Sequence, residues 1–295
     1  MVFNRIKTVI LLATLSGLLM AIGSLIGGTT GIQFALAMAM IFNGIAYFFS
    51  DKIVLRMYGA QPLDATTYDW IYTMVEELAA DMAIPMPKLW LLNTPIANAF
   101  ATGRNPNHSS VALTKTIINI LDKDELRGVL AHELSHVKNR DILVTTIAAT
   151  IATAIGYLAN MLRWGAMWGS MSNDGRRRDS NPIVLMLIGI IMPFAALLIQ
   201  LAISRSREYL ADETGADCCR DPLALASALE KLNDYAKHGT TDTHAQDPRY
   251  ASTASLFIVN PFTDSSWATL FSTHPPMSKR VERLRALSTK MFHTR

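Results

Sequence analysis

Four long apolar runs constrain the fold of this chain more than any other feature of its sequence. Each is close to 20 residues long and holds few or no charged side chains: Ile6–Ile26, Gln33–Ser50, Ile142–Leu162 and Ile183–Ile203. A helix of about 21 residues is roughly 31 Å long, which matches the hydrocarbon thickness of a bilayer. Half of the 295 residues are hydrophobic, only 17% are charged, and the mean hydropathy is +0.22. The sequence therefore predicts four membrane-spanning helices arranged in two hairpins.

Two other interpretations of these runs are open. The first run follows basic residues, and "ALAMAM" resembles the cleavage region of a signal peptide. That stretch lies inside the second run, however, so an uncleaved hairpin is the better prediction. The last two runs could instead be a pair of buried core helices, although uncharged runs of this length are more typical of membrane spans.

The positions of basic residues predict the orientation of the first hairpin. Basic residues stand at both outer ends of the first two runs: Arg5, Lys7, Lys52 and Arg56. The turn between these runs, "GSLIGGTTGIQ", has no charge. This pattern places the N-terminus and residues 51–141 in the cytoplasm.

The loop between the last two runs disagrees with that orientation. It contains "GRRRD", with Arg176, Arg177 and Arg178, although four complete spans would export it. Either the earlier signals dominate, or the second hairpin does not fully cross the membrane. Both alternatives leave residues 51–141 and 204–295 on the same face of the membrane.

The stretch "VLAHELSHVKNRD" contains an HExxH motif on a predicted helix. Asp122 and Glu125 have the spacing of a capping box at its start. His132 and His136 project from one side of such a helix, one turn apart, and both can reach one zinc ion. Glu133 lies about 100° further round the helix, where it can accept a proton from water. Because HExxH arises by chance on the order of 1% of the time in a chain of this length, a third ligand is needed.

A candidate third ligand follows the fourth apolar run, in "SRSREYLADETGAD". Glu208 would complete a set of two histidines and one carboxylate, and Asp212 lies one helical turn further on. Asp212 can accept a hydrogen bond from a ligand imidazole and fix its tautomer. The alternative for this segment alone is a solvated, charged helix beside the membrane.

With these motifs, the chain resembles the HtpX-type membrane-bound zinc metalloproteases, which are relatives of the CAAX prenyl endoproteases. The resemblance rests on "NAFATG", "AHELSHVKNRD", "SRSREYLADETGA" and "STHPPMSKRVERL", together with the paired apolar runs. It implies that His132, His136 and Glu208 bind one Zn²⁺ per subunit and that Glu133 is the general base. It also implies cleavage of membrane proteins, damaged ones in particular, from the cytoplasmic side of a bacterial inner membrane.

Three further residues are candidates for the site. "KLWLLNTPIANAFATG" and "SSVALT" predict short strands around the turn "RNPNH", and an edge strand there can pair with an extended peptide. Asn98 is either a contact to the substrate backbone or a strand-end asparagine. His274 is either a stabiliser of the oxyanion or a histidine at a helix entry. Arg280 either pairs with a carboxylate of the site or lies on the surface.

The sequence thus predicts a mainly α chain with a small β-sheet, four transmembrane helices in two hairpins and a zincin-like (HExxH…E) cytoplasmic catalytic domain. The predicted segments are a first hairpin, the strands with the HExxH helix, a second hairpin and a C-terminal catalytic part: residues 1–50, 51–141, 142–203 and 204–295. The expected partners are the lipid bilayer and membrane-protein substrates. The net charge of +3 is too diffuse for nucleic-acid binding, and no P-loop motif indicates a nucleotide. A CAAX-type prenyl endoprotease and a non-enzymatic membrane zinc protein are the alternatives.

Overall fold

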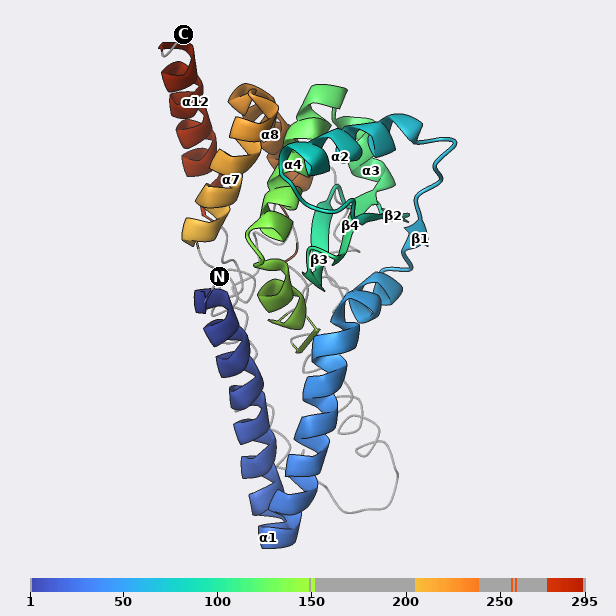
Figure 1. Ribbon diagram of the computed structural model, residues 1–295, viewed down its shortest axis with the longest axis vertical. Coiled ribbons are helices and arrows are strands. Elements are labelled where there is room, and N and C mark those ends of the chain that lie inside the picture. The colour runs from blue at the N-terminus through green and yellow to red at the C-terminus, as the bar shows by residue number, and fades with distance from the viewer. Residues whose placement is uncertain are drawn as a thin grey trace, which may run out of the picture.

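The computed structural model describes residues 2–148, 150–151, 205–238, 256, 258 and 275–293. Within them the fold is mainly helical with one small mixed β-sheet, as predicted (Figure 1). The labelled elements are α1 (Val2–Met57), β1 (Gln61–Pro62), α2 (Asp69–Asp81), β2 (Lys88–Leu92), β3 (Ala99–Asn105), β4 (His108–Thr114), α3 (Lys115–Ile120), α4 (Lys123–Lys138), α7 (Arg205–Cys219), α8 (Pro222–His238) and α12 (Met277–His293). Residues 142–148 and 150–151 are helical as well.

Helix α1 folds back on itself as two antiparallel arms that meet far from the sheet (Figure 1). The reversal lies at Gly28, whose φ of +56° is a left-handed conformation that costs a residue without a Cβ atom little. The Asn43 amide joins the arms, because its Nδ2 donates to Ser16 Oγ at 2.9 Å and to the Leu12 carbonyl at 3.5 Å. The two apolar runs of residues 6–50 therefore form a hairpin.

Among the described residues, one segment is long and apolar enough to cross a membrane: Gly28–Met57, with a mean hydropathy of 1.7. A shorter apolar helix, Thr8–Ala21, lies in the other arm. The predicted second hairpin, residues 142–203, lies almost wholly outside the described residues, so the prediction of four spanning helices stays a prediction. Its first turns are covered by protein, because Ile142, Val144 and Ile147 are buried.

The four-stranded sheet has the order β1-β2-β4-β3. Strands β3 and β4 form the predicted antiparallel hairpin around "RNPNH", with Ala101 opposite Val111. Strand β2 runs parallel to β4, with Trp90 opposite Ala112. Strand β3 is therefore at one edge of the sheet, and this edge lies beside α4.

Helix α4 is the centre of the core, with α7 and α8 packed against it and β3 beside it (Figure 1). Its apolar side chains Leu126, Leu130 and Leu134 are fully buried, and each contributes roughly 1.5–3 kcal/mol to folding. Helix α7 approaches α4 so closely at Gly215 that a Cβ there would lie 2.9 Å from the backbone nitrogen of His132. This backbone contact fixes the position of α7 relative to the HExxH helix.

Candidate metal centre

Helix α4 carries the two histidines of the HExxH motif, and a capping box fixes its N-terminus. The predicted capping box is confirmed: Asp122 accepts a hydrogen bond from the Glu125 amide at 2.9 Å, and Glu125 accepts one from the Asp122 amide at 3.0 Å. His132 and His136 project from the same side of the helix, with their Nε2 atoms 3.3 Å apart. The two imidazoles therefore converge on one point.

Glu208 on α7 completes a group of three side chains that could hold a metal ion. Its carboxylate oxygens lie 3.7 Å from His136 Nε2 and 3.8 Å from His132 Nε2. One ligand atom from each of the three residues lies within 4.8 Å of the others. Tetrahedral ligands at about 2.0–2.1 Å from a zinc ion are roughly 3.3 Å apart, so this donor set fits such an ion with small side-chain adjustments.

Each imidazole is backed by a carboxylate on its Nδ1 atom. Asp141 Oδ2 lies 3.1 Å from Nδ1 of His136. Asp212 Oδ1 lies 3.0 Å from Nδ1 of His132, in an ion-pair contact whose geometry falls short of a hydrogen bond. Such carboxylates orient ligand imidazoles and raise their basicity. Both Nε2 atoms face the candidate metal position, where Nη2 of Arg280 also lies 3.4 Å from Nε2 of His132.

Sequence reasoning identified Asp212 but missed Asp141. Helix α4 ends at Lys138, and Arg140 then adopts φ +58°, the left-handed conformation common after helix ends. This turns the chain back, so that the Asp141 amide donates to the His136 carbonyl at 3.2 Å. The usual signal for such a turn is a glycine, and an arginine stands there instead.

Arg280 comes from the first turns of α12 and has no exposed surface. Its Nε and one terminal nitrogen donate to the two oxygens of Asp212, at 2.9 and 2.7 Å. Burial raises the pKa of Asp212, but Arg280 and His132 outweigh it and lower that pKa to about 2. The structure thus places Arg280 against a carboxylate of the site, which was one of its two predicted positions.

Protonation of the centre depends on the same carboxylates. Burial lowers the pKa of His136, but Asp141 and then Glu208 outweigh it and raise the pKa to about 10. Burial raises the pKa of Glu133, against the lowering effect of the two histidines. Glu133 Oε2 accepts a hydrogen bond from the Ala101 amide of β3 at 2.9 Å. The candidate base therefore lies between the metal ligands and the edge strand.

The group of described residues that could hold a metal ion includes neither of the other two predicted site residues, Asn98 and His274. The side-chain amide of Asn98 is buried and forms hydrogen bonds with the main chain of Leu256 and Ile258. Its proposed contact with a substrate gains no support from these interactions. His274 lies outside the described residues, so its role stays a prediction.

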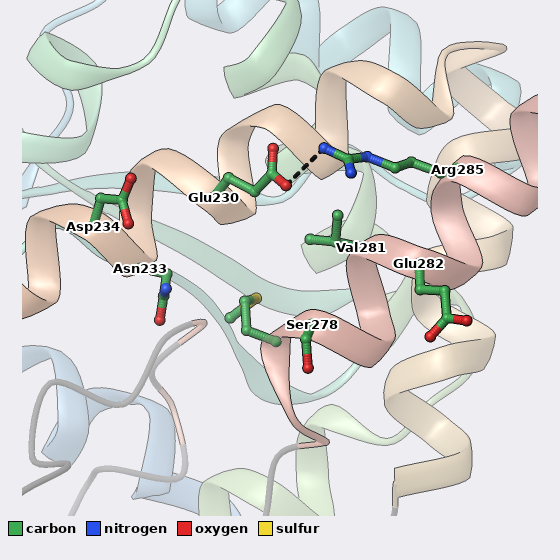
Figure 2. Close-up of a pocket in the computed structure, with 8 residues that line it drawn as sticks. Glu230, Asn233, Asp234, Ser278, Val281, Glu282 and Arg285 are labelled. Atoms are coloured by element: carbon green, nitrogen blue, oxygen red, sulfur yellow. Dashed lines mark hydrogen bonds and ion pairs between the residues drawn. The ribbon is translucent and has the colours of Figure 1, made fainter.

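A surface pocket of about 590 Å³ lies between α8 and α12 (Figure 2). The ion pair between Arg285 of α12 and Glu230 of α8, at 2.8 Å, joins the two helices that line it. His132, His136 and Glu208 are not among its lining residues. The chemistry of the histidines and carboxylates is therefore not located in this pocket.

Comparison with known proteins gives a consistent result. Residues 65–288 match the model of peptidase family M48. A "Protease HtpX homolog" of Persephonella marina is 50% identical over 98% of this chain and 99% of its own length. One of Aquifex aeolicus is 49% identical over 94% of this chain and 90% of its own length. The crystal structure of S. mikatae Ste24p aligns over 96% of this chain and 66% of that chain, with a TM-score of 0.51 and 17% identity, which is a likeness of fold.

Proposed function

The chain belongs to peptidase family M48 and is a membrane metallopeptidase, and from this premise we propose that it is a zinc-dependent endopeptidase of the bacterial inner membrane. Its proposed substrates are damaged or misfolded membrane proteins, which it cuts on the cytoplasmic side. The observation that carries this proposal is the convergence of His132, His136 and Glu208, with ligand atoms within 4.8 Å of one another.

Zinc is the proposed metal because of the chemistry of these donors. Two imidazoles and one carboxylate are the ligand set of many catalytic zinc sites, which keep a fourth position for water or substrate. When bound, zinc supplies a Lewis acid that lowers the pKa of water and polarises the scissile carbonyl. Asp141 and Asp212 would hold the two imidazoles in the tautomer that ligation requires.

Glu133 is the proposed general base. It neighbours the ligand His132 on α4 and is buried, and burial raises its pKa towards the range that suits proton transfer. In this role it takes a proton from the attacking water and passes it to the leaving amine. The Ala101 amide holds one carboxylate oxygen of Glu133 at 2.9 Å, and the other oxygen would accept that proton.

The edge strand β3 is the proposed binding site for the substrate main chain. A peptide that pairs with an edge strand is held mainly by backbone hydrogen bonds, so its sequence matters little. This suits an enzyme that removes damaged proteins of many sequences. His274 remains the proposed stabiliser of the oxyanion. With no P-loop in the sequence, the enzyme would need segments that are already flexible rather than unfold them with ATP.

Several features support the proposed membrane arrangement of four spans with both catalytic parts in the cytoplasm. The α1 hairpin contains the candidate span Gly28–Met57. Basic residues flank the hairpin at both outer ends, as expected for cytoplasmic flanks. The lipid bilayer and membrane-protein segments are the proposed partners, without nucleic acid or nucleotide.

The test is digestion of a panel of membrane proteins by the purified full-length chain and its Glu133→Gln variant, both loaded with zinc. We expect the wild type to cut the panel and a chelator to stop it until zinc is returned. Loss of a general base typically costs 10²–10⁴-fold in rate, so Glu133→Gln should be slower by about that factor while it still binds one zinc. Cleavage by the variant at the wild-type rate would exclude Glu133 as the base. Zinc binding by a wild type that never cuts would favour a scaffold.

A further inference from the structure

The Asn98 side chain is held by the chain itself in a manner that points away from substrate binding. Its Nδ2 donates to the Leu256 carbonyl at 3.2 Å, and its Oδ1 accepts from the Ile258 amide at 3.1 Å. Only 3% of Asn98 is exposed. We propose that Asn98 is a positioning residue of the metal centre, which acts through Ile258 and Arg280 on the ligand Glu208. This inference rests on the proposed function, because it assumes that the centre binds zinc.

Asn98 holds the main chain of Leu256 and Ile258 in a fixed position. Its own amide donates to Thr114 Oγ1 at 3.0 Å, and its carbonyl accepts from the Thr114 amide at 2.9 Å, so its backbone is fixed to β4. The side-chain amide offers one donor and one acceptor, as a peptide group does. It therefore holds Leu256 and Ile258 as a neighbouring strand would, across 158 and 160 residues of sequence.

The carbonyl of Ile258 connects the Asn98 side chain to the candidate metal centre. It accepts a hydrogen bond at 3.4 Å from Nη1 of Arg280, whose other two nitrogens bind Asp212. The same Nη1 atom lies 3.9 Å from Oε2 of the proposed ligand Glu208. Nη1 thus donates to a neutral carbonyl while it lies within ion-pair distance of the carboxylate proposed to bind the metal.

Loss of the Asn98 side chain would change which oxygen atom Nη1 of Arg280 contacts. A buried guanidinium needs acceptors for its N–H groups, because an unpaired buried donor is costly. Without Asn98 the Ile258 carbonyl is no longer held in place, and Nη1 turns towards Glu208. Arg280 would then compete with the ion for the carboxylate. Changes to groups that orient metal ligands typically reduce metal affinity 10- to 100-fold, and we expect Asn98→Ala to fall in this range.

The experiment is a zinc titration against a competing chelator, with the full-length protein in detergent micelles. All variants carry Glu133→Gln, so that self-cleavage does not interfere. The matched control is Asn93→Ala, because Asn93 is an exposed asparagine five residues earlier in the chain. Asn98→Ala should raise the zinc Kd at least 10-fold, and Asn93→Ala should leave it within 2-fold. An Asn98→Ala Kd within 2-fold of the parent would overturn the inference.

A double-mutant cycle tests the route through Arg280. Arg280→Lys removes the nitrogen that Ile258 and Glu208 share, so Asn98→Ala should change the zinc Kd less than 2-fold in that background. An equal effect in both backgrounds would show that Asn98 does not act through Arg280. If Asn98→Ala fails to fold, as judged by its circular dichroism spectrum, Asn98→Asp takes its place. This variant keeps the acceptor for Ile258 but loses the donor to Leu256, and a 3- to 10-fold rise in Kd is expected.

The same titration separates this inference from the proposed function. If the Glu133→Gln parent binds no zinc, the proposed function fails. If the parent binds zinc and Asn98→Ala binds it equally well, only the positioning role fails. A substrate contact would leave the zinc Kd unchanged and raise KM for a peptide substrate in the active enzyme.

Discussion

The candidate metal centre buries polar side chains, whereas helix α1 exposes apolar ones. At the centre, Arg280, His132 and Glu133 are 0%, 2% and 6% exposed, although all three are polar. In α1, the apolar Phe34 and Val9 are 70% and 65% exposed. A buried charge is tolerable only with a partner, whereas an exposed apolar side chain suits lipid in any orientation. Structure at the centre therefore depends on particular pairs of residues, and structure in α1 depends on composition.

The largest effect expected from this difference is on pH dependence. The pKa of His136 is raised from 6.5 to about 10, so at neutral pH a proton must leave before this imidazole can bind a metal. Each pH unit lowers the cost of that step by about 1.4 kcal/mol, so zinc affinity should rise about tenfold per unit between pH 6 and 8. Without metal, the stability contributed by this proton is complete below about pH 6.5 and is lost as pH rises through about 10. Chelator competition at several pH values measures how zinc affinity changes with pH. An affinity that does not change between pH 6 and 8 would contradict the ion pair between His136 and Asp141.

The next largest effect concerns the partner that supplies this pairing. Asp141→Asn removes the carboxylate at 3.1 Å from His136, and zinc affinity should fall roughly 10- to 100-fold. The pH slope should flatten as well, because Asp141 is the main cause of the raised pKa. Asp124→Asn, at an exposed position in the first turn of α4, is the control and should change neither quantity.

Two glycines sharpen the comparison of packing. In Gly215→Ala the new Cβ would meet the α4 backbone at 2.9 Å, and such overpacking typically destabilises by about 1–3 kcal/mol. In Gly44→Ala on α1 nothing lies within 4 Å, and replacing a helical glycine should stabilise by up to about 1 kcal/mol. Thermal unfolding in one detergent compares the pair. Equal effects would mean that α7 does not pack on α4 through its backbone.

The smallest effect is expected for the polar contact inside α1. Asn43→Leu removes the bond to Ser16, and bonds of this kind between membrane helices average about 0.6 kcal/mol. Stability should therefore fall by no more than about 1 kcal/mol, with cleavage and zinc affinity unchanged. A loss of zinc binding in this variant would show that the hairpin and the centre are coupled more tightly than this comparison allows.

Local patterns predicted much of the site. The capping box, the HExxH spacing and the turn of helix between Glu208 and Asp212 depend on residues close in sequence, where helix geometry fixes the result. The hairpin around "RNPNH" was predictable for the same reason. Arg280 was placed with two alternatives, because its spacing to Asp212 spans 68 residues and no local pattern connects them.

The contacts that sequence reasoning missed depend on an unusual backbone conformation or on segments that are distant in sequence. Asp141 reaches His136 only because a non-glycine residue, Arg140, adopts a positive φ. Leu256 and Ile258 join the site through Asn98, about 160 residues away, and neither carries a side chain that suggests metal chemistry. Their contribution comes from main-chain groups, which every sequence position offers equally.

The close approach of α7 to α4 at Gly215 has a consequence for the thermodynamics of metal capture. Glu208 stands seven residues, about two helical turns, before Gly215, so both lie on the same face of α7. The close packing of the two helix backbones limits how far the carboxylate can move from the imidazoles, so small side-chain adjustments are enough to close the site. An ion that bound here would meet donors on preorganised helices, so little backbone entropy would be lost on binding.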